Sequence, residues 1–276
     1  MSGVFSALRS VAAAVYSAFA LAMRRVARRC PSRSWENHNM PPQPLAKFRP
    51  GHQGVSFTLM DDAMEKRPNL AVLVMRVINI WSYADHTLAT LTTNFLKADF
   101  ETVAAMLQAL TGGGARRAAI KAAARSTLSP DDFTLFEVVM KVIKASHDRR
   151  HEFAHFLWGI LPNEPDVLLL LNPKYLAQFD AKTRSWSAEF MAYRPMRGER
   201  PDIPPDTEIV LAEVFVYREQ DLLEDVSHAM KAYELVFNLH LALSPSHPAA
   251  DDGRSELLNQ PQVRQALERL SNENGQ

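Results

Sequence analysis

Residues 146–158 carry the densest set of side chains that could take part in chemistry. The segment holds three of the nine histidines, two arginines and two carboxylates. On a helix, His151 and His155 would lie one turn apart on one face, and Asp148, seven residues before His155, would share that face. Arg150 would be offset from His155 by about 140°, but its long side chain could still reach the same cleft. The spacing therefore predicts one candidate site.

Hydrolysis by a zinc ion is one chemistry that fits the segment. The sequence His151-Glu152-x-x-His155 is the metalloprotease pattern, in which both histidines bind zinc and the glutamate is the general base. However, Trp158 stands where the extended metzincin pattern has a glycine, and the residues that follow offer no acidic third ligand on a helix. Two arginines also precede the motif and place positive charge beside the cation. Zinc bound by His151 and His155 remains an alternative.

Cleavage of RNA without a metal ion is the second chemistry. It needs proton transfer at the 2′-hydroxyl and at the leaving oxygen, and positive charge for the phosphorane. Arg150 can hold phosphate oxygens bidentately, and a histidine near neutral pKa, here His155, can transfer the protons. The types of these two side chains, Arg150 and His155, therefore suit this chemistry.

Four further residues are assigned supporting roles. His151 would sit beside His155 and tune it, and Asp148 and Glu152 belong to the same segment. Asp85 interrupts a strongly apolar helical segment, and a buried carboxylate needs a partner. Arg150 and His155 are natural partners for it.

The motif Arg150-His151-x-x-x-His155, followed by Leu157-Trp158-Gly159 near the end of a long helix, resembles that of the HEPN superfamily. The resemblance implies a helical domain and a metal-independent endoribonuclease of the defence or toxin type, with Arg150 and His155 as its catalytic residues and no cofactor. It also implies a homodimer in which two motif helices face each other, RNA as the substrate, and a separate antitoxin-type protein as partner.

A non-catalytic helical interaction module that keeps the motif for its structure is the main alternative. In that case His151 and His155 satisfy hydrogen bonds between helices, and Arg149 and Arg150 are solvated charges at a helix end. Glu152 would then pair with Arg149 or with neither arginine. A zinc-dependent hydrolase is the second alternative.

Composition limits how such a protein could bind RNA. Residues 1–60 hold eight of the 31 Lys and Arg but only one of the 31 Asp and Glu, so the remainder is acidic by seven charges. Contact with RNA would therefore have to be local. The single cysteine, Cys30, excludes an intrachain disulfide and is typical of a reducing compartment, so we expect a cytoplasmic protein.

The N-terminal segment supports three interpretations. Residues 1–40 could be a surface or targeting helix, a signal sequence, or the product of a start-site error. The apolar run at residues 11–23 is shorter than the ~20 residues that cross a bilayer, and charges interrupt the apolar segment at 69–96. We therefore expect no membrane span.

The expected fold is mainly α, a helical bundle with a small β-hairpin or sheet excursion after the motif helix. Apolar periodicity and caps predict helices at residues 69–96, 100–110, 115–125, 130–158 and 220–243, and strands at 167–171, 185–193 and 208–217. The glycines at 112–114 are expected to form a turn.

Three regions follow from this pattern. Residues 1–60 form a poorly ordered apolar, Arg-rich and Pro-rich lead-in. Residues 61–243 form the helical domain, with the β insertion at about 165–217. Residues 244–276 form a loose polar tail with one short helix at 263–270.

Overall fold

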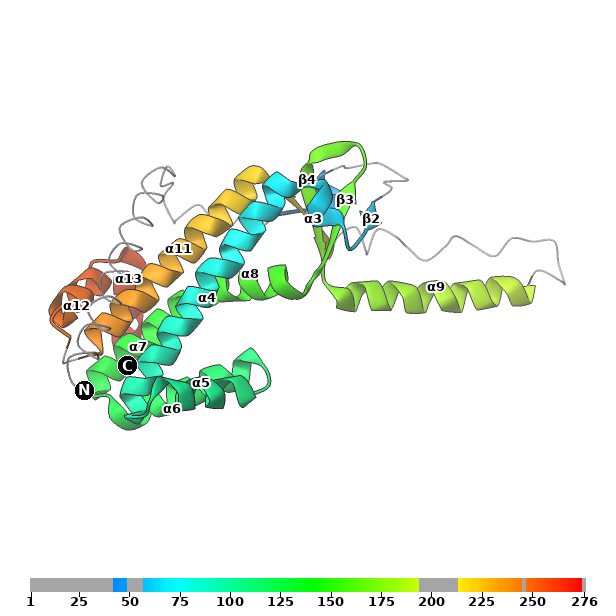
Figure 1. Cartoon of the computed structure of the whole chain (residues 1–276). Coiled ribbons are helices and arrows are strands. Elements are labelled where there is room, and N and C mark those ends of the chain that lie inside the picture. Colours follow the sequence, from blue (N-terminus) through cyan, green and yellow to red (C-terminus); the bar gives the residue numbers. More distant parts are fainter. Residues whose placement is uncertain (1–41, 49–56, 194–212, 245–246, 275–276) are drawn as a thin grey trace. The chain divides into compact units, whose positions relative to one another are not determined.

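The structure is a computed structural model, and it describes residues 42–48, 57–193, 213–244 and 247–274. Helices make up most of this part of the chain, and five short strands form one antiparallel sheet (Figure 1). The expected class, a mainly helical fold with a small sheet, is therefore confirmed. Within the described ranges no helix is long and apolar enough to cross a membrane.

Two long helices, α4 (Pro68–Leu96) and α11 (Glu219–Ala242), form the centre of the bundle. They run side by side in the same direction (Figure 1), and near their ends Asn94 Nδ2 donates a hydrogen bond of 2.8 Å to Ser244 Oγ. Each helix buries a long stripe of apolar side chains, and the same apolar side chains are the signal that predicts the helix from the sequence. Both predictions are confirmed to within one residue.

Helices α5 (Phe100–Ala109) and α6 (Gly113–Thr127) pack against α4 and are joined by a turn at Gly112. Asp99 caps α5 by accepting a hydrogen bond of 2.8 Å from the Thr102 amide. Gly112 has a φ of +91°, in the region that glycine adopts readily. The helix start at Asp99 is therefore confirmed, whereas the expected glycine turn is confirmed only at Gly112, because Gly113 and Gly114 are the first residues of α6.

The single helix predicted over residues 130–158 is wrong in two respects. It is divided into α7 (Pro130–Val142) and α8 (Lys144–His155), which meet at the buried Ile143. No proline or glycine marks that junction, so the sequence carries no signal for it. The predicted C-terminal end also leaves the helix, because β3 (Leu157–Leu161) pairs with two strands of the sheet.

The sheet has the strand order β1-β5-β4-β3-β2, and all neighbouring strands are antiparallel. The other strands are β1 (Gln43–Pro44), β2 (Thr58–Leu59), β4 (Glu164–Leu171) and β5 (Val214–Arg218). The apolar run of β4 is buried along its length, which confirms the strand predicted at 167–171. Strand β3 approaches β2 so closely at Gly159 that a Cβ there would lie 2.6 Å from the Thr58 carbonyl oxygen.

The strand predicted at residues 185–193 is wrong, because these residues form the end of helix α9 (Pro173–Tyr193). A nine-residue window of mixed polarity fits either period, and the helix that begins at Pro173 simply continues through it. The strand predicted at 208–217 is confirmed at 214–217 within β5, and residues 208–212 lie outside the described part of the chain.

Part of the expected lead-in belongs to the folded body. Strands β1 and β2 extend the two edges of the sheet, and the short helices α2 (Leu45–Phe48) and α3 (Ala63–Lys66) flank them in the sequence. Leu45 is fully buried among the apolar side chains of β4 and β5. Residues 1–41 and 49–56 lie outside the described part of the chain.

The C-terminal segment is more ordered than the loose tail that its composition predicts. It forms α12 (Ala250–Leu258) and α13 (Pro261–Asn274), which pack against α11 and α7. Leu257 and Val263 are fully buried, and Arg254 forms an ion pair with Asp132 at the start of α7. A few well-placed apolar residues therefore suffice to anchor a polar segment.

Candidate functional site

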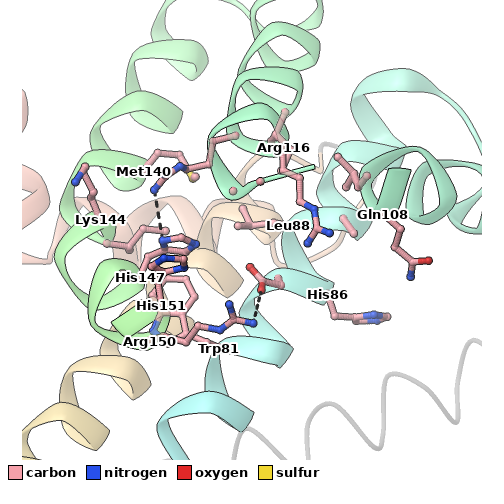
Figure 2. A pocket seen from close by; sticks show the side chains of 18 of the residues that line it. Trp81, His86, Leu88, Gln108, Arg116, Met140, Lys144, His147, Arg150 and His151 are labelled. Carbon is pink, nitrogen blue, oxygen red and sulfur yellow. Dashed lines mark hydrogen bonds and ion pairs between the residues drawn. The ribbon is translucent and has the colours of Figure 1, made fainter. Parts of the chain in front are cut away.

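A cleft of about 570 Å³ lies among α4, α5, α6, α7 and α8. Four residues singled out from the sequence line it: Asp85 from α4, and Arg150, His151 and His155 from α8 (Figure 2). The structure therefore brings the central part of the motif and the distant carboxylate together. The rest of the cleft is lined by basic side chains (Arg116, Arg117, Lys144), by histidines (His86, His147) and by apolar side chains such as Trp81, Leu88, Phe100 and Leu107.

Helix α8 presents its two site histidines on one face, as their spacing predicts. The ring centroids of His151 and His155 lie 4.6 Å apart, and both side chains are exposed. His155 is the last residue of the helix, because Phe156 adopts an extended backbone with ψ 164°. A hydrogen bond of 3.1 Å from Trp81 Nε1 to Ser146 Oγ ties α8 to α4. The histidines are therefore accessible to a ligand on a helix that is held in place.

Arg150 reaches the cleft despite its different angular position on the helix. Its Nη2 lies 3.9 Å from Asp85 Oδ2, which is an ion pair longer than a hydrogen bond. Its Nε is buried and has no acceptor among the described residues. The guanidinium therefore has donors to spare, which is the condition of a group that can bind an external anion.

Asp85 is the carboxylate among the described lining residues, and four cationic side chains line the same cleft. Burial raises the pKa of Asp85 above its ordinary value, and the charges of Arg150, His147 and Arg116 oppose that rise. Asp85 is thus held in a cationic environment that an incoming anion would share. Arg150 is the partner that its sequence context predicts.

Asp148 does not line the cleft itself, but it contacts three basic side chains that do. It forms ion pairs with Lys144 and with Arg117, the latter at 3.8 Å, and it lies 3.6 Å from His147 Nδ1. Partial burial alone would raise the pKa of Asp148, but the hydrogen bond and charge of Lys144 lower it. Burial, together with the charge of Arg117, lowers the pKa of His147. Asp148 opposes this lowering of the His147 pKa, so burial and Arg117 outweigh the nearby carboxylate.

Glu152 does not line the cleft, and it joins a network with residues of β5 and α11 instead. Arg149 Nη1 donates hydrogen bonds to Glu152 Oε2 at 2.6 Å and to Tyr217 Oη at 2.8 Å, and its Nε lies 3.5 Å from Asp225 Oδ1. The rings of Phe153 and Tyr217 meet edge to face at 5.3 Å beside this network. Glu152 therefore pairs with Arg149, and the structure gives it no contact with the cleft histidines.

The network around Arg149 contains a largely buried carboxyl group, that of Asp225. The side chain of Asp225 is 14% exposed, and burial raises its pKa to about 7, against the lowering effect of Arg149. Asp221 and Glu152 raise it further. Two carboxyl groups, Asp225 and Glu152, thus share one guanidinium between α8 and α11.

The zinc alternative requires a third ligand and a glutamate beside the bound water. In the part of the chain that the structure describes, no three His, Cys, Asp or Glu side chains gather as a metal ion requires. The glutamate of the pattern, Glu152, is engaged with Arg149 instead. These placements offer nothing that supports the zinc alternative.

Sequence reasoning missed Arg116, Arg117, Lys144 and His147, all of which line the cleft. The signal that could have found two of them is the arginine pair directly after three glycines, at the start of a helix otherwise rich in alanine. Lys144 and His147 lie seven and four residues before His151, so the helical spacing that relates His151 to His155 also reaches them.

No family model matches this chain, and neither a curated protein nor a solved structure matches it.

Proposed function

We propose that this chain is a HEPN-like protein that cleaves RNA without a metal ion, with Arg150 as the phosphate clamp and His155 as the acid or base. The observation that supports this is the presence of both side chains in one cleft whose charged lining is mainly cationic. Because the chain after residue 60 is acidic as a whole, such a local cleft is what binding to a phosphodiester would require.

The reaction needs three groups. The 2′-oxygen attacks the adjacent phosphorus while a base takes the 2′-hydroxyl proton. The bond from phosphorus to the 5′-oxygen then breaks, and an acid protonates that oxygen. The products are a 2′,3′-cyclic phosphate and a free 5′-hydroxyl. His155 transfers a proton, and the planar guanidinium of Arg150 stabilises the charge on the phosphorane.

His151 supports His155 in this proposal. Its ring lies within contact distance of the His155 ring, so a charge on either ring affects the other. A homodimer would bring a second set of Arg150 and His155 side chains to the same substrate and complete the acid–base pair. A separate antitoxin-type protein that covers the cleft, in the cytoplasm, belongs to the same proposal.

Cleavage of RNA by the full-length protein, with and without EDTA, tests the proposal, together with a zinc assay on the same sample. We expect cleavage that survives EDTA. His155→Ala should reduce it by about 100-fold or more while the unfolding midpoint stays unchanged, because general acid–base catalysis contributes about that much.

Glu152→Gln is the matched control. Since Glu152 does not line the cleft and pairs with Arg149, this variant should keep its activity once it is shown to be folded, whereas a zinc enzyme would lose its general base. Stoichiometric zinc together with loss of activity in Glu152→Gln would instead identify a zinc hydrolase. Persistent cleavage by His155→Ala would remove the proposed mechanism, and no cleavage at all would favour the interaction module.

A further inference from the structure

The wall of the cleft opposite α8 carries cationic side chains that the proposed reaction does not use. Arg116 and Arg117 lie in the first two turns of α6, and both line the cleft. Figure 2 shows the Arg116 side chain entering from α6 and the Arg150 side chain entering from α8, toward the same space. The cleft therefore has positive charge on two separate walls.

The guanidinium of Arg116 is poorly satisfied by the protein itself. Within the described residues Arg116 forms no ion pair, although its charge acts on Asp85 across the cleft. Arg117 shares Asp148 at 3.8 Å and lies 3.4 Å from His147 Nδ1, and both distances are long for strong contacts. Both arginines thus keep donors available for an anion.

Apolar side chains lie between the two cationic walls. Leu88 and Ala89 of α4 and Leu107 of α5 are buried at the bottom of the cleft, and Phe100 is a partly exposed aromatic side chain on its lining. The Phe100 and His86 rings lie 4.9 Å apart, which leaves an aromatic surface at one side. A surface of this kind suits a base or a ribose, and the charges on either side suit the phosphates that flank it.

We propose that Arg116 and Arg117 form a second phosphate subsite, so that the cleft binds single-stranded RNA through at least two phosphates. One phosphate contacts Arg150 and another contacts the arginines of α6, with a nucleoside against the apolar floor. A cleft of about 570 Å³ has the size of a ligand pocket and holds a short stretch of one strand, not a duplex. The inference rests on the proposed function only in naming RNA as the ligand.

The test is equilibrium binding of the full-length protein to labelled 2′-O-methyl oligouridylates of one to six nucleotides, followed by fluorescence anisotropy. These oligomers lack the 2′-hydroxyl, so binding is measured without cleavage. We expect affinity to rise once the oligomer carries a second phosphate. Arg116→Gln/Arg117→Gln should remove this rise and weaken binding of the longer oligomers about tenfold, with little change for the one-phosphate ligand.

The matched control changes the same number of charges on the same helix. Lys121 pairs with Glu137 and Arg125 lies over the Phe133 ring, and neither residue lines the cleft. Lys121→Gln/Arg125→Gln should therefore bind the longer oligomers like the wild type. A plot of log affinity against log salt has a negative slope. In the Arg116→Gln/Arg117→Gln variant this slope should become less steep by about 0.7 for each lost phosphate contact, and in the control variant it should not change.

A charge-retaining variant separates charge from fold. Arg116→Lys/Arg117→Lys should keep most of the affinity at low salt, and urea unfolding should give the same midpoint for all variants. The subsite is overturned if the glutamine variant binds like the control, or if no oligomer binds to the wild type.

Failure of the subsite and failure of the proposed function give different results. Oligomer binding that depends on Arg116 and Arg117, in a protein that cleaves no RNA, would support the subsite and reject the ribonuclease. Cleavage by a protein whose binding ignores Arg116 and Arg117 would support the ribonuclease and overturn the subsite.

Discussion

Arg149 and Arg150 are neighbours in the sequence, yet they meet opposite surroundings because successive residues on a helix point about 100° apart. Arg149 enters a buried network with Glu152, Tyr217 and Asp225. Arg150 enters the cleft, where one carboxylate, Asp85, lies 3.9 Å away. One face of α8 thus holds one arginine between two carboxyl groups, whereas the cleft is lined by four Lys and Arg side chains and one carboxylate among the described residues.

The difference separates structure from function within a single motif. A network whose donors and acceptors are all used rigidifies the fold and has nothing left for a ligand. A cleft whose partly exposed arginines keep donors unused by the protein can offer them to a ligand. The segment Arg149-Arg150-His151-Glu152 therefore contains both structural residues and residues of the candidate site, and the sequence alone does not distinguish them.

The largest effect should come from breaking the buried face. Arg149→Met leaves the carboxyl groups of Asp225 and Glu152 without their shared cation, and it should lower the free energy of unfolding by about 3 kcal/mol. The cost should lie at the low end for such networks because Asp225 can take up a proton. Urea unfolding followed by circular dichroism measures it.

The control for this prediction is the neighbouring arginine. Arg150→Met removes only a long, partly exposed ion pair, so it should cost about 1 kcal/mol or less. Equal destabilisation by the two variants would show that the two faces of α8 do not differ as described.

Asp225→Asn should change how stability depends on pH. Burial raises the pKa of Asp225 to about 7 in the folded protein, above its ordinary value of 3.8. Between these two values the folded state binds more protons than the unfolded state, so this group lowers the free energy of unfolding as pH rises from 4 to 7. The variant should therefore gain on the wild type across this window, on the order of 3 kcal/mol for a shift of this size.

Paired urea unfolding curves at pH 4, 5.5 and 7 check this prediction. Other titrating groups, such as His147, are present in both proteins and cancel in the difference. A difference that stays constant with pH would mean that Asp225 is ionised throughout and that Arg149 compensates its burial fully.

Arg150→Lys should reduce RNA cleavage about tenfold, because lysine keeps the charge but loses the planar fork that holds two phosphate oxygens. Arg149→Lys should leave the rate per folded molecule unchanged, since that residue does not line the cleft. Initial rates on one RNA substrate measure both. Full activity of the Arg150 variant would reduce this residue to a surface charge.

Much of the fold was within reach of the sequence, because long apolar periods and caps act locally. The stripes of α4 and α11, the Asp99 cap and the start of α7 at Ser129 and Pro130 all follow from residues close together in the chain. Two features could not be predicted from the sequence. No proline or glycine marks the junction at Ile143, and the strand that follows His155 forms because it pairs with strands distant in the chain.

The candidate site, like the fold, could be predicted from the sequence only in part. The sequence shows the spacing of His151 and His155 and the position of Asp85 within an apolar helix, but the carboxyl group expected there to be buried is exposed in the structure. The contribution of Arg116 arises only when α6 packs against α4, and no local pattern encodes that contact. The position of Glu152 also depends on packing, because Arg149, Tyr217 and Asp225 come together from three separate elements.

The smallest predicted effect concerns Asp85, the carboxylate on the cleft face. Asp85→Asn removes a negative charge from the place where we expect phosphate, so binding of the 2′-O-methyl oligouridylates should tighten about three- to tenfold at pH 8. Because the pKa of Asp85 is raised, its neutral form persists to higher pH, and the two proteins should bind alike toward acidic pH. Weaker binding by the variant would show instead that Asp85 positions Arg150, and the cleft would then depend on this ion pair as the buried face depends on its network.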